Sequence, residues 1–225
     1  MRTLSQNHPL VLLALALLLG AADGVGQAVK LQKPEVPTRE QPVFAVIETS
    51  MGSMKIELYQ ADAPKTVENF EKLAEKKFFD GTRVHRVSRT EGIVQMGDDK
   101  SKDTTKVSEW GTGGHSAWGK EFQDELYPNS ASYKEGYRKG VVAMMNRGPN
   151  TNGSQFFIAL KDLPYMPRNY TIFGKVVQGQ DILDRIGKVQ VVPLLGADDG
   201  RPKQSILVKR ITIMKETNAK SEDKK

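Results

Sequence analysis

Residues 148–158, GPNTNGSQFFI, constrain the fold of this chain more than any other stretch. The Gly, Pro, Asn and Thr residues at its start favour a tight turn that hydrogen-bonds to itself. Phe156, Phe157 and Ile158 then supply the aromatic and β-branched side chains that are typical of a packed strand. The pattern predicts a polar loop that leads directly into a buried strand, with the amide of Gln155 at the junction.

Seven further segments have the composition of short strands. In one of them, Met54, Ile56 and Leu58 alternate with polar or charged residues, and the turn at residues 50–53 joins it to the preceding apolar run as a predicted hairpin. The full set of predicted strands is residues 44–49, 54–58, 85–87, 92–96, 140–145, 155–160, 171–177 and 205–214.

Two segments repeat apolar residues at helical spacing. The first begins with the start signal Asp62-Ala63-Pro64 and ends before the turn dipeptide Asp80-Gly81. The second covers residues 180–186 and places Ile182, Leu183 and Ile186 on one side. Many short strands with turn signals between them, and only two helices, favour a mainly β fold with a closed antiparallel barrel over a βαβ fold.

The two ends of the chain differ from the middle. One Arg, an unbroken apolar run over residues 10–19 and then small residues predict a signal peptide at residues 1–22, with cleavage as late as residue 26. The apolar run is shorter than the roughly 20 residues that span a bilayer, so a permanent anchor is the less favoured alternative. Residues 23–42 are a predicted flexible linker, residues 43–216 a single domain and residues 217–225 a polar tail.

The composition argues against several partners and cofactors. The net charge is +6, but Lys and Arg alternate with Asp and Glu and form no basic patch with aromatic residues, so no nucleic-acid binding is expected. The absence of Cys excludes disulfides and a lipidated N-terminal Cys, so no membrane attachment is expected after signal cleavage. His85 and His115 lack a second ligand at regular spacing, so no metal is expected, and Ser154 lacks the surroundings of a hydrolase nucleophile.

Residues 148–158 resemble the corresponding stretch of cyclophilins, the cyclosporin-binding class of peptidyl-prolyl isomerases. The motifs VHRV at residues 84–87 and QMGD at residues 95–98 strengthen this resemblance, and WGKEF at residues 118–122 continues it. The resemblance covers roughly residues 43–215. It implies a closed eight-stranded antiparallel β-barrel with one α-helix over each open end, and an isomerase that needs no cofactor.

Proline isomerisation requires few catalytic groups. Rotation about the X–Pro bond faces a barrier of ~18–20 kcal/mol because the nitrogen lone pair is delocalised into the carbonyl. A donor to the prolyl nitrogen and an apolar pocket for the ring are sufficient, and a guanidinium suits the first role because it stays charged and presents a fixed fork of N–H groups. In cyclophilins the Arg after a Phe-His pair has this role, so the resemblance implies that Arg86 is catalytic, although Val84 replaces the Phe. The alternative is an edge-strand Arg in a surface ion pair.

The resemblance also implies the substrate-binding residues. Gln95 matches the Gln that holds the substrate backbone and orients the Arg, Asn146 matches the Asn whose backbone binds the residue before proline, and Gln155 matches a groove-lining amide. Phe157 matches the floor of the proline pocket, although taken alone it reads as ordinary core. The side chains expected to shape that pocket are Ile93, Met145, Phe157, Tyr165, Met166 and Tyr170.

Several family positions are altered. Gly92 and Ile93 replace a Phe-Met pair, which removes part of the aromatic wall, and Met145 replaces a small residue and is expected to narrow the groove. Tyr165 replaces the Trp that is associated with cyclosporin binding; because an indole N–H and a phenol O–H reach different places, weakened cyclosporin binding is expected. Tyr170 replaces a His, so activity is expected to depend little on pH through this position.

The segment of residues 99–110 is longer than the connection that cyclophilins usually have at this place, and it is rich in Lys, Asp, Ser and Thr. They form either a solvated loop or an excursion beside the groove that binds a partner.

Together these features predict an exported peptidyl-prolyl cis-trans isomerase that accelerates the folding of exported proteins and binds proline-containing polypeptides. The alternative is a weakly catalytic module or chaperone that binds Pro-containing segments, and a barrel that carries small apolar ligands is disfavoured because the strands offer no long apolar lumen. For the compartment, the periplasm is favoured, and the extracellular space and the endoplasmic reticulum lumen stay open.

Overall fold

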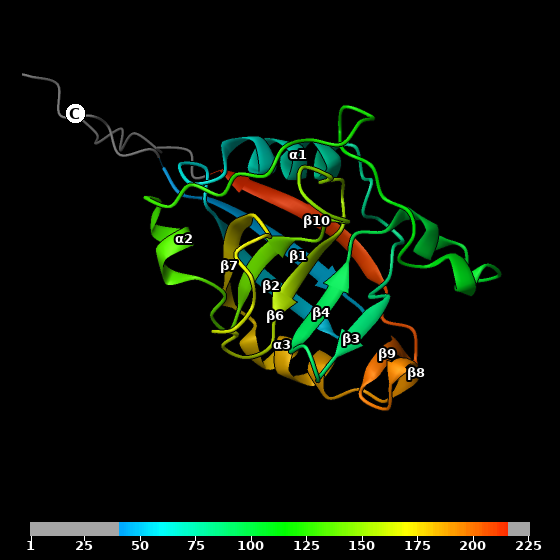
Figure 1. The fold of residues 1–225 in the computed structure, drawn as a ribbon. Helices are drawn as coiled ribbons and strands as arrows, with labels where there is room; N and C mark the ends of the chain where they lie inside the picture. Colours follow the sequence, from blue (N-terminus) through cyan, green and yellow to red (C-terminus); the bar gives the residue numbers. More distant parts are fainter. Residues whose placement is uncertain (1–40, 216–225) are drawn as a thin grey trace, which may run out of the picture. The chain divides into compact units, whose positions relative to one another are not determined.

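A computed structural model describes residues 41–215 of the chain (Figure 1). The predicted signal peptide, nearly all of the predicted linker and the predicted polar tail lie outside these residues. None of the described helices is both long and apolar enough to cross a lipid bilayer.

The described domain is mainly β, and its strands form one antiparallel sheet in the order β10-β1-β2-β7-β5-β6-β4-β3-β9-β8. The predicted strands are confirmed with small shifts at their ends. The observed strands are β1 Val43–Thr49, β2 Gly52–Leu58, β3 Arg86–Ser88, β4 Ile93–Met96, β5 Val141–Met144, β6 Phe156–Ala159, β7 Ile172–Gln178, β8 Val191–Gly196, β9 Asp199–Pro202 and β10 Val208–Lys215.

The sheet differs from the expected closed eight-stranded barrel in two ways. Its strand order is open, and the chain before β3 meets the chain before β10 only through an isolated bridge between Arg83 and Leu207 and neighbouring backbone hydrogen bonds. The hairpin of β8 and β9 adds two strands that pattern reasoning missed, since Pro193 interrupts β8 and β9 reads Asp-Gly-Arg-Pro, a composition typical of turns.

Two helices pack against the sheet, and Figure 1 shows α1 above the strands and α3 below them. Helix α1, Pro64–Glu75, and helix α3, Gln180–Gly187, bury the apolar faces that their spacing predicted. Phe70 of α1 is fully buried among Phe79, Phe156 and Phe173, and removing a side chain of this size from water contributes roughly 1.5–3 kcal/mol. A third, short helix, α2 at Ala131–Glu135, was not predicted.

The start of α1 is fixed by a distant residue. Pro64 begins the helix as predicted, but Ala63 supplies no side-chain cap. The carboxylate of Glu125 instead accepts hydrogen bonds from the backbone N–H groups of Lys65 (3.0 Å) and Thr66 (2.8 Å). A carboxylate is favourable at a helix N-terminus because that end carries partial positive charge. This contact ties the helix to the segment that directly follows the WGKEF motif of residues 118–122.

Candidate active site

One row of side chains crosses four neighbouring strands. Arg86 of β3 is the register partner of Gln95 on β4, Gln95 is the partner of Phe157 on β6, and Phe157 is the partner of Ala143 on β5. Residues directly opposite each other in antiparallel strands point to the same face of the sheet. Strand pairing therefore places three of the predicted site residues on one face, although they are far apart in the sequence.

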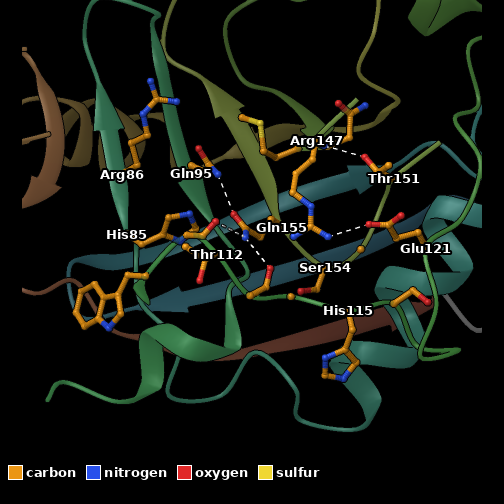
Figure 2. A pocket seen from close by; sticks show the side chains of 18 of the residues that line it. His85, Arg86, Gln95, Thr112, His115, Glu121, Arg147, Thr151, Ser154 and Gln155 are labelled. Atoms are coloured by element: carbon orange, nitrogen blue, oxygen red, sulfur yellow. Dashed lines mark hydrogen bonds and ion pairs between the residues drawn. The ribbon is translucent and has the colours of Figure 1, made fainter. Parts of the chain in front are cut away.

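A cavity of about 590 Å³ opens beside this row (Figure 2). Half of the ten predicted site residues line it: Arg86, Gln95, Met145, Asn146 and Gln155. The remaining wall comes from residues that were not among the predicted site residues, including His85, Trp110, residues 111–116, Arg147, Leu194 and Leu195.

The two glutamines form a fixed pair inside the cavity. Nε2 of Gln95 donates to Oε1 of Gln155 at 2.8 Å, and Nε2 of Gln155 donates to the carbonyl oxygens of Gly111 (3.0 Å) and Gly113 (2.8 Å). Both side chains are buried, and Figure 2 shows them pointing toward each other. A buried amide that is hydrogen-bonded in this way has one defined orientation, so the pair presents a fixed polar surface to the cavity.

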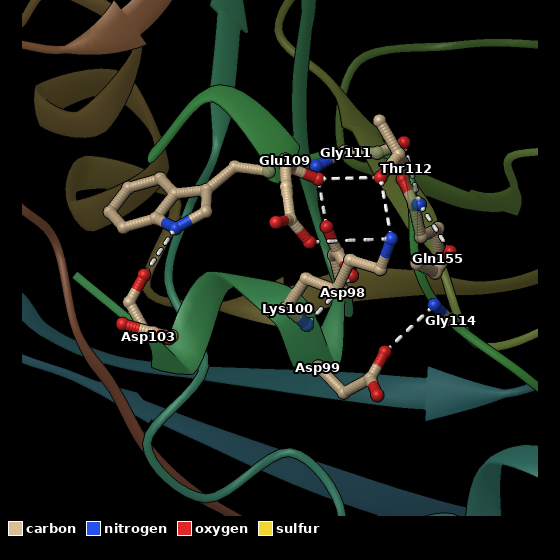
Figure 3. A network of polar contacts seen from close by, with 11 residues as sticks. Asp98, Asp99, Lys100, Asp103, Glu109, Gly111, Thr112, Gly114 and Gln155 are labelled. Carbon is tan, nitrogen blue, oxygen red and sulfur yellow. Dashed lines mark hydrogen bonds and ion pairs between the residues drawn. The ribbon is translucent and has the colours of Figure 1, made fainter. Parts of the chain in front are cut away.

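The glycine-rich wall of the cavity is held by two aspartates (Figure 3). Asp98 accepts hydrogen bonds from the backbone N–H groups of Lys100 (3.0 Å) and Gly111, and Asp99 accepts one from Gly114 at 2.8 Å. Burial raises the pKa of Asp98, while its backbone donors lower it. Gly114 has a φ of +90°, and an added Cβ would lie 2.7 Å from the hydroxyl oxygen of Ser154, so glycine is required there.

The predicted catalytic Arg86 is held in ion pairs. Its Nε and Nη2 donate to the two carboxylate oxygens of Asp199 at 2.8 and 2.6 Å, and Nη2 also donates to Glu91 at 2.5 Å. Arg86 is thus in ion pairs, as the alternative expected, but its side chain is only 14 % exposed and that of Asp199 6 %, while Glu91 is 45 % exposed. The hydrogen bonds that Arg86 donates to Asp199 lower the pKa of Asp199 and raise the pKa of Arg86, so both groups stay charged.

The orientation of Arg86 differs from the expectation in one respect. Gln95 lies directly across the strand pair, but the hydrogen bonds of the guanidinium go to Asp199 and Glu91, and Figure 2 shows the Arg86 side chain extending away from the glutamine pair. Sequence reasoning missed Asp199 because it lies 113 positions from Arg86, in the hairpin that was not predicted. Within residues 41–215, Nη1 of Arg86 has no hydrogen-bond partner.

The predicted floor of the proline pocket is covered. Phe157 is fully buried, and the ring of Tyr170 meets it edge-on with centroids 5.6 Å apart. The same apolar cluster also includes Ile93, Met145 and Met166 of the predicted site, and Tyr137 and Leu163, which sequence reasoning did not place there. Methionine side chains are flexible and adopt several rotamers, so the part of the cluster that Met145 and Met166 contribute can change shape.

The predicted site therefore divides into two groups. Arg86, Gln95, Asn146 and Gln155 line the polar cavity, while Ile93, Phe157, Met166 and Tyr170 belong to the apolar cluster, and Met145 belongs to both. Tyr165 is 97 % exposed and belongs to neither group. Among residues 41–215, no three or more His, Cys, Asp or Glu side chains are placed to hold a metal ion.

The fold is that of a cyclophilin-type domain. Residues 44–213 match the family described as "Cyclophilin type peptidyl-prolyl cis-trans isomerase/CLD", so the chain belongs to this family.

Curated relatives and solved structures agree with this assignment. Human "Peptidyl-prolyl cis-trans isomerase-like 1" is 40% identical over 154 residues, which are 68% of this chain and 85% of the relative. The protein of the same name from Aspergillus niger is 37% identical over 170 residues, 76% of this chain and 94% of the relative. The crystal structure of a cyclophilin type peptidyl-prolyl cis-trans isomerase from Cryptosporidium parvum has a TM-score of 0.64 and 32% identity, and the match covers 78% of this chain and 99% of that chain.

Proposed function

We propose that the protein is an exported peptidyl-prolyl cis-trans isomerase that accelerates the folding of other exported proteins. The observation that carries this proposal is a permanently charged guanidinium on the wall of a peptide-sized groove, beside a fixed pair of amides. The groove suits an extended polypeptide with a proline, and no group in the proposed chemistry requires a cofactor.

The mechanism follows from the donors of Arg86. Asp199 and Glu91 occupy Nε and Nη2, so the N–H groups of Nη1 are the donors left for substrate. A donor to the prolyl nitrogen stabilises the lone pair that localises there as the bond twists, and this stabilisation is greater in the transition state than in the planar ground state. Gln95 and Gln155 hold the peptide backbone, and the cluster around Phe157 receives the prolyl ring.

The direct test measures isomerisation of an Ala-Pro peptide by NMR exchange, with and without the protein. Ala-Pro is a suitable probe because the Cryptosporidium parvum protein was also crystallised "in the presence of dipeptide ala-pro". The expected result is exchange far faster than the uncatalysed tens of seconds. An unchanged exchange rate at saturating protein would exclude the isomerase.

The second candidate function is a weakly catalytic module or chaperone that binds Pro-containing segments. Two observations favour it: the floor residue Phe157 is covered, and the guanidinium of Arg86 extends toward Asp199 and away from the glutamine pair. A comparison of peptide affinity with turnover separates the two functions, because a binding module retains affinity while isomerisation stays at the background rate.

Export is the part of the proposal that rests on residues 1–22, which lie outside the described residues. We propose the periplasm as the compartment. The test is expression of this chain in a bacterial host, followed by fractionation and N-terminal sequencing. Recovery from the periplasm with an N-terminus near residue 23 to 27 supports export and cleavage, and an uncleaved cytoplasmic product contradicts them.

Replacing Asp199 with asparagine is predicted to weaken catalysis through Arg86. The change removes the charge that holds two guanidinium nitrogens, so kcat should fall about tenfold with little change in KM, and the free energy of unfolding should fall by roughly 2 kcal/mol.

The matched control is Asp198→Asn, since the adjacent Asp198 is 62 % exposed and pairs with the surface residue Arg89. This control should change neither kcat nor stability appreciably. A rise in kcat in the Asp199 variant would contradict the prediction and identify Asp199 as a restraint on Arg86.

Replacing Tyr165 with tryptophan is predicted to tighten cyclosporin binding. The resemblance assigns this position to a Trp whose indole N–H donates a hydrogen bond, and one such bond contributes about 0.5–1.5 kcal/mol, or roughly three- to tenfold in Kd. Because Tyr165 is almost fully exposed, the change should not disturb folding. Calorimetric titration of the two proteins provides the comparison, and equal affinities would show that this position does not limit cyclosporin binding.

A further inference from the structure

The hairpin of β8 and β9 exposes two adjacent leucines beside the groove. Leu194 and Leu195 are 70 % and 72 % exposed, and both line the same cavity as Arg86 and Gln95. β8 is the last strand of the sheet, and such edge strands normally carry charges or short polar segments that discourage association. Two neighbouring exposed leucines on an edge strand, facing a functional cavity, therefore indicate a binding surface.

The hairpin is tied to β3, the strand that carries Arg86. In the ladder between β3 and β9, Val87 pairs with Gly200 and Ser88 pairs with Asp199. The carboxylate of Asp199 accepts hydrogen bonds from Arg86 and, at 2.8 Å, from the hydroxyl of Ser88. The leucines are thus carried by an element that is anchored beside the guanidinium.

A third apolar side chain completes this surface. Trp110, at the end of the long loop of residues 99–110, lines the cavity, and its indole N–H is engaged by the carbonyl oxygen of Asp103 at 2.9 Å. The guanidinium of Arg201, on β9, lies 5.6 Å from the centroid of the Trp110 ring, which links the loop to the hairpin. We call Trp110, Leu194 and Leu195 the apolar wall.

We propose that the apolar wall is a specificity subsite that binds a large apolar side chain of the polypeptide substrate, within a few residues of its proline. The proposal rests on the function proposed above, because the occupant is the same substrate chain. Continuity supports this occupant: the wall, Arg86 and the glutamine pair line one cavity. A second copy of this chain, added as a strand along β8, fits less well because Pro193 lacks the backbone N–H that strand pairing needs.

The test compares the binding of a set of peptides that differ only beside the proline. One has alanines on both sides of an Ala-Pro unit, and the others carry a single leucine at each flanking position in turn. For at least one leucine position the protein should bind about tenfold more tightly than the alanine peptide, as expected for burial of one leucine side chain. In the double variant Leu194→Ser, Leu195→Ser this affinity ratio should fall to about one.

The matched control is Val192→Ser, which changes an apolar residue of the same strand that is 41 % exposed and does not line the cavity. It should keep the wild-type ratio, and thermal unfolding of both variants checks that the hairpin change leaves the domain folded.

The outcomes separate this proposal from the proposed function. Equal affinity of the wild-type protein for all the peptides, together with catalysed isomerisation, overturns the subsite and leaves the isomerase intact. A leucine preference that depends on the wall, without isomerisation, supports the subsite and overturns the isomerase. If the double variant changes only the sedimentation behaviour of the protein and keeps the leucine preference, the leucines serve self-association and the subsite proposal is wrong.

Discussion

The Arg86→Ala variant is expected to isomerise an Ala-Pro peptide with kcat/KM lowered by about 100-fold or more, the effect typical of removing one preorganised donor from a transition state. The loss should fall on kcat, because the donor acts on a nitrogen that becomes basic only as the imide bond twists. Peptide affinity should change little, since Gln95 and Gln155 keep their hydrogen bonds to each other and to the glycine-rich wall.

A second variant separates catalysis from folding. Alanine at position 86 leaves the buried carboxylate of Asp199 without its cation, so part of any loss could reflect a disturbed hairpin. Arg86→Lys keeps a positive charge near Asp199. It lacks the guanidinium fork, which donates to both carboxylate oxygens and still has a third nitrogen available for substrate. Its stability should lie closer to wild type, while its kcat stays low.

The measurement is NMR exchange at equilibrium, which needs no coupling protease. Rates within about threefold of wild type in both variants, for proteins with unchanged unfolding transitions, would remove Arg86 from the mechanism.

Local patterns were sufficient for most of the fold. The alternation in residues 54–58 and the helical spacing of Val67, Phe70 and Leu73 depend on neighbours only a few positions away, so they could be seen in the sequence. The β8–β9 hairpin could not, because Asp199 and Gly200 are strand residues only through their pairing with β3. Likewise, the cap of α1 comes from Glu125, some 60 positions from the helix start, which no local start signal reveals.

Half of the predicted site residues line one cavity, but the connections between them were not predictable from the sequence. The resemblance pointed to Arg86, Gln95 and Gln155; strand register sets Arg86 opposite Gln95, and all three line the cavity. It did not reveal that Asp199 would hold the guanidinium or that the ring of Tyr170 would meet Phe157 edge-on, because both depend on side chains that converge from separate strands and loops.

The buried imidazole of His85 gives the second large expected effect, on stability. His85 lines the cavity but is almost fully buried, and neither ring nitrogen has a hydrogen-bond partner among the described residues. Burial lowers the pKa of His85 to about 4, and the positive charge of Arg86 lowers it further. Polar contacts with the Arg83 backbone and with Gln155 raise this pKa only in part, because they fall short of hydrogen-bond geometry.

The sign of the pH dependence follows from this lowered pKa. In the unfolded chain His85 takes up a proton near its ordinary pKa of 6.5, whereas in the folded protein it stays neutral down to about pH 4. The contribution of His85 to the free energy of unfolding is therefore at its full value above pH 6.5. It declines as the pH falls toward 4, by about 3 kcal/mol in total. Asp98 opposes this trend, since its raised pKa favours the folded state at low pH, and Asp199 contributes a loss only below its ordinary value of 3.8.

The variant His85→Gln isolates the imidazole from these other groups. It removes the titrating ring and keeps a polar side chain, so its free energy of unfolding in urea should decline by about 3 kcal/mol less than that of the wild type between pH 7.5 and pH 4. His115→Gln, which replaces an exposed imidazole, is the matched control. Parallel curves for wild type and His85→Gln would mean that the imidazole is protonated in the folded protein at mildly acidic pH. Its two unpartnered nitrogens would then have found acceptors, and the cavity wall beside Arg86 would have to rearrange to supply them.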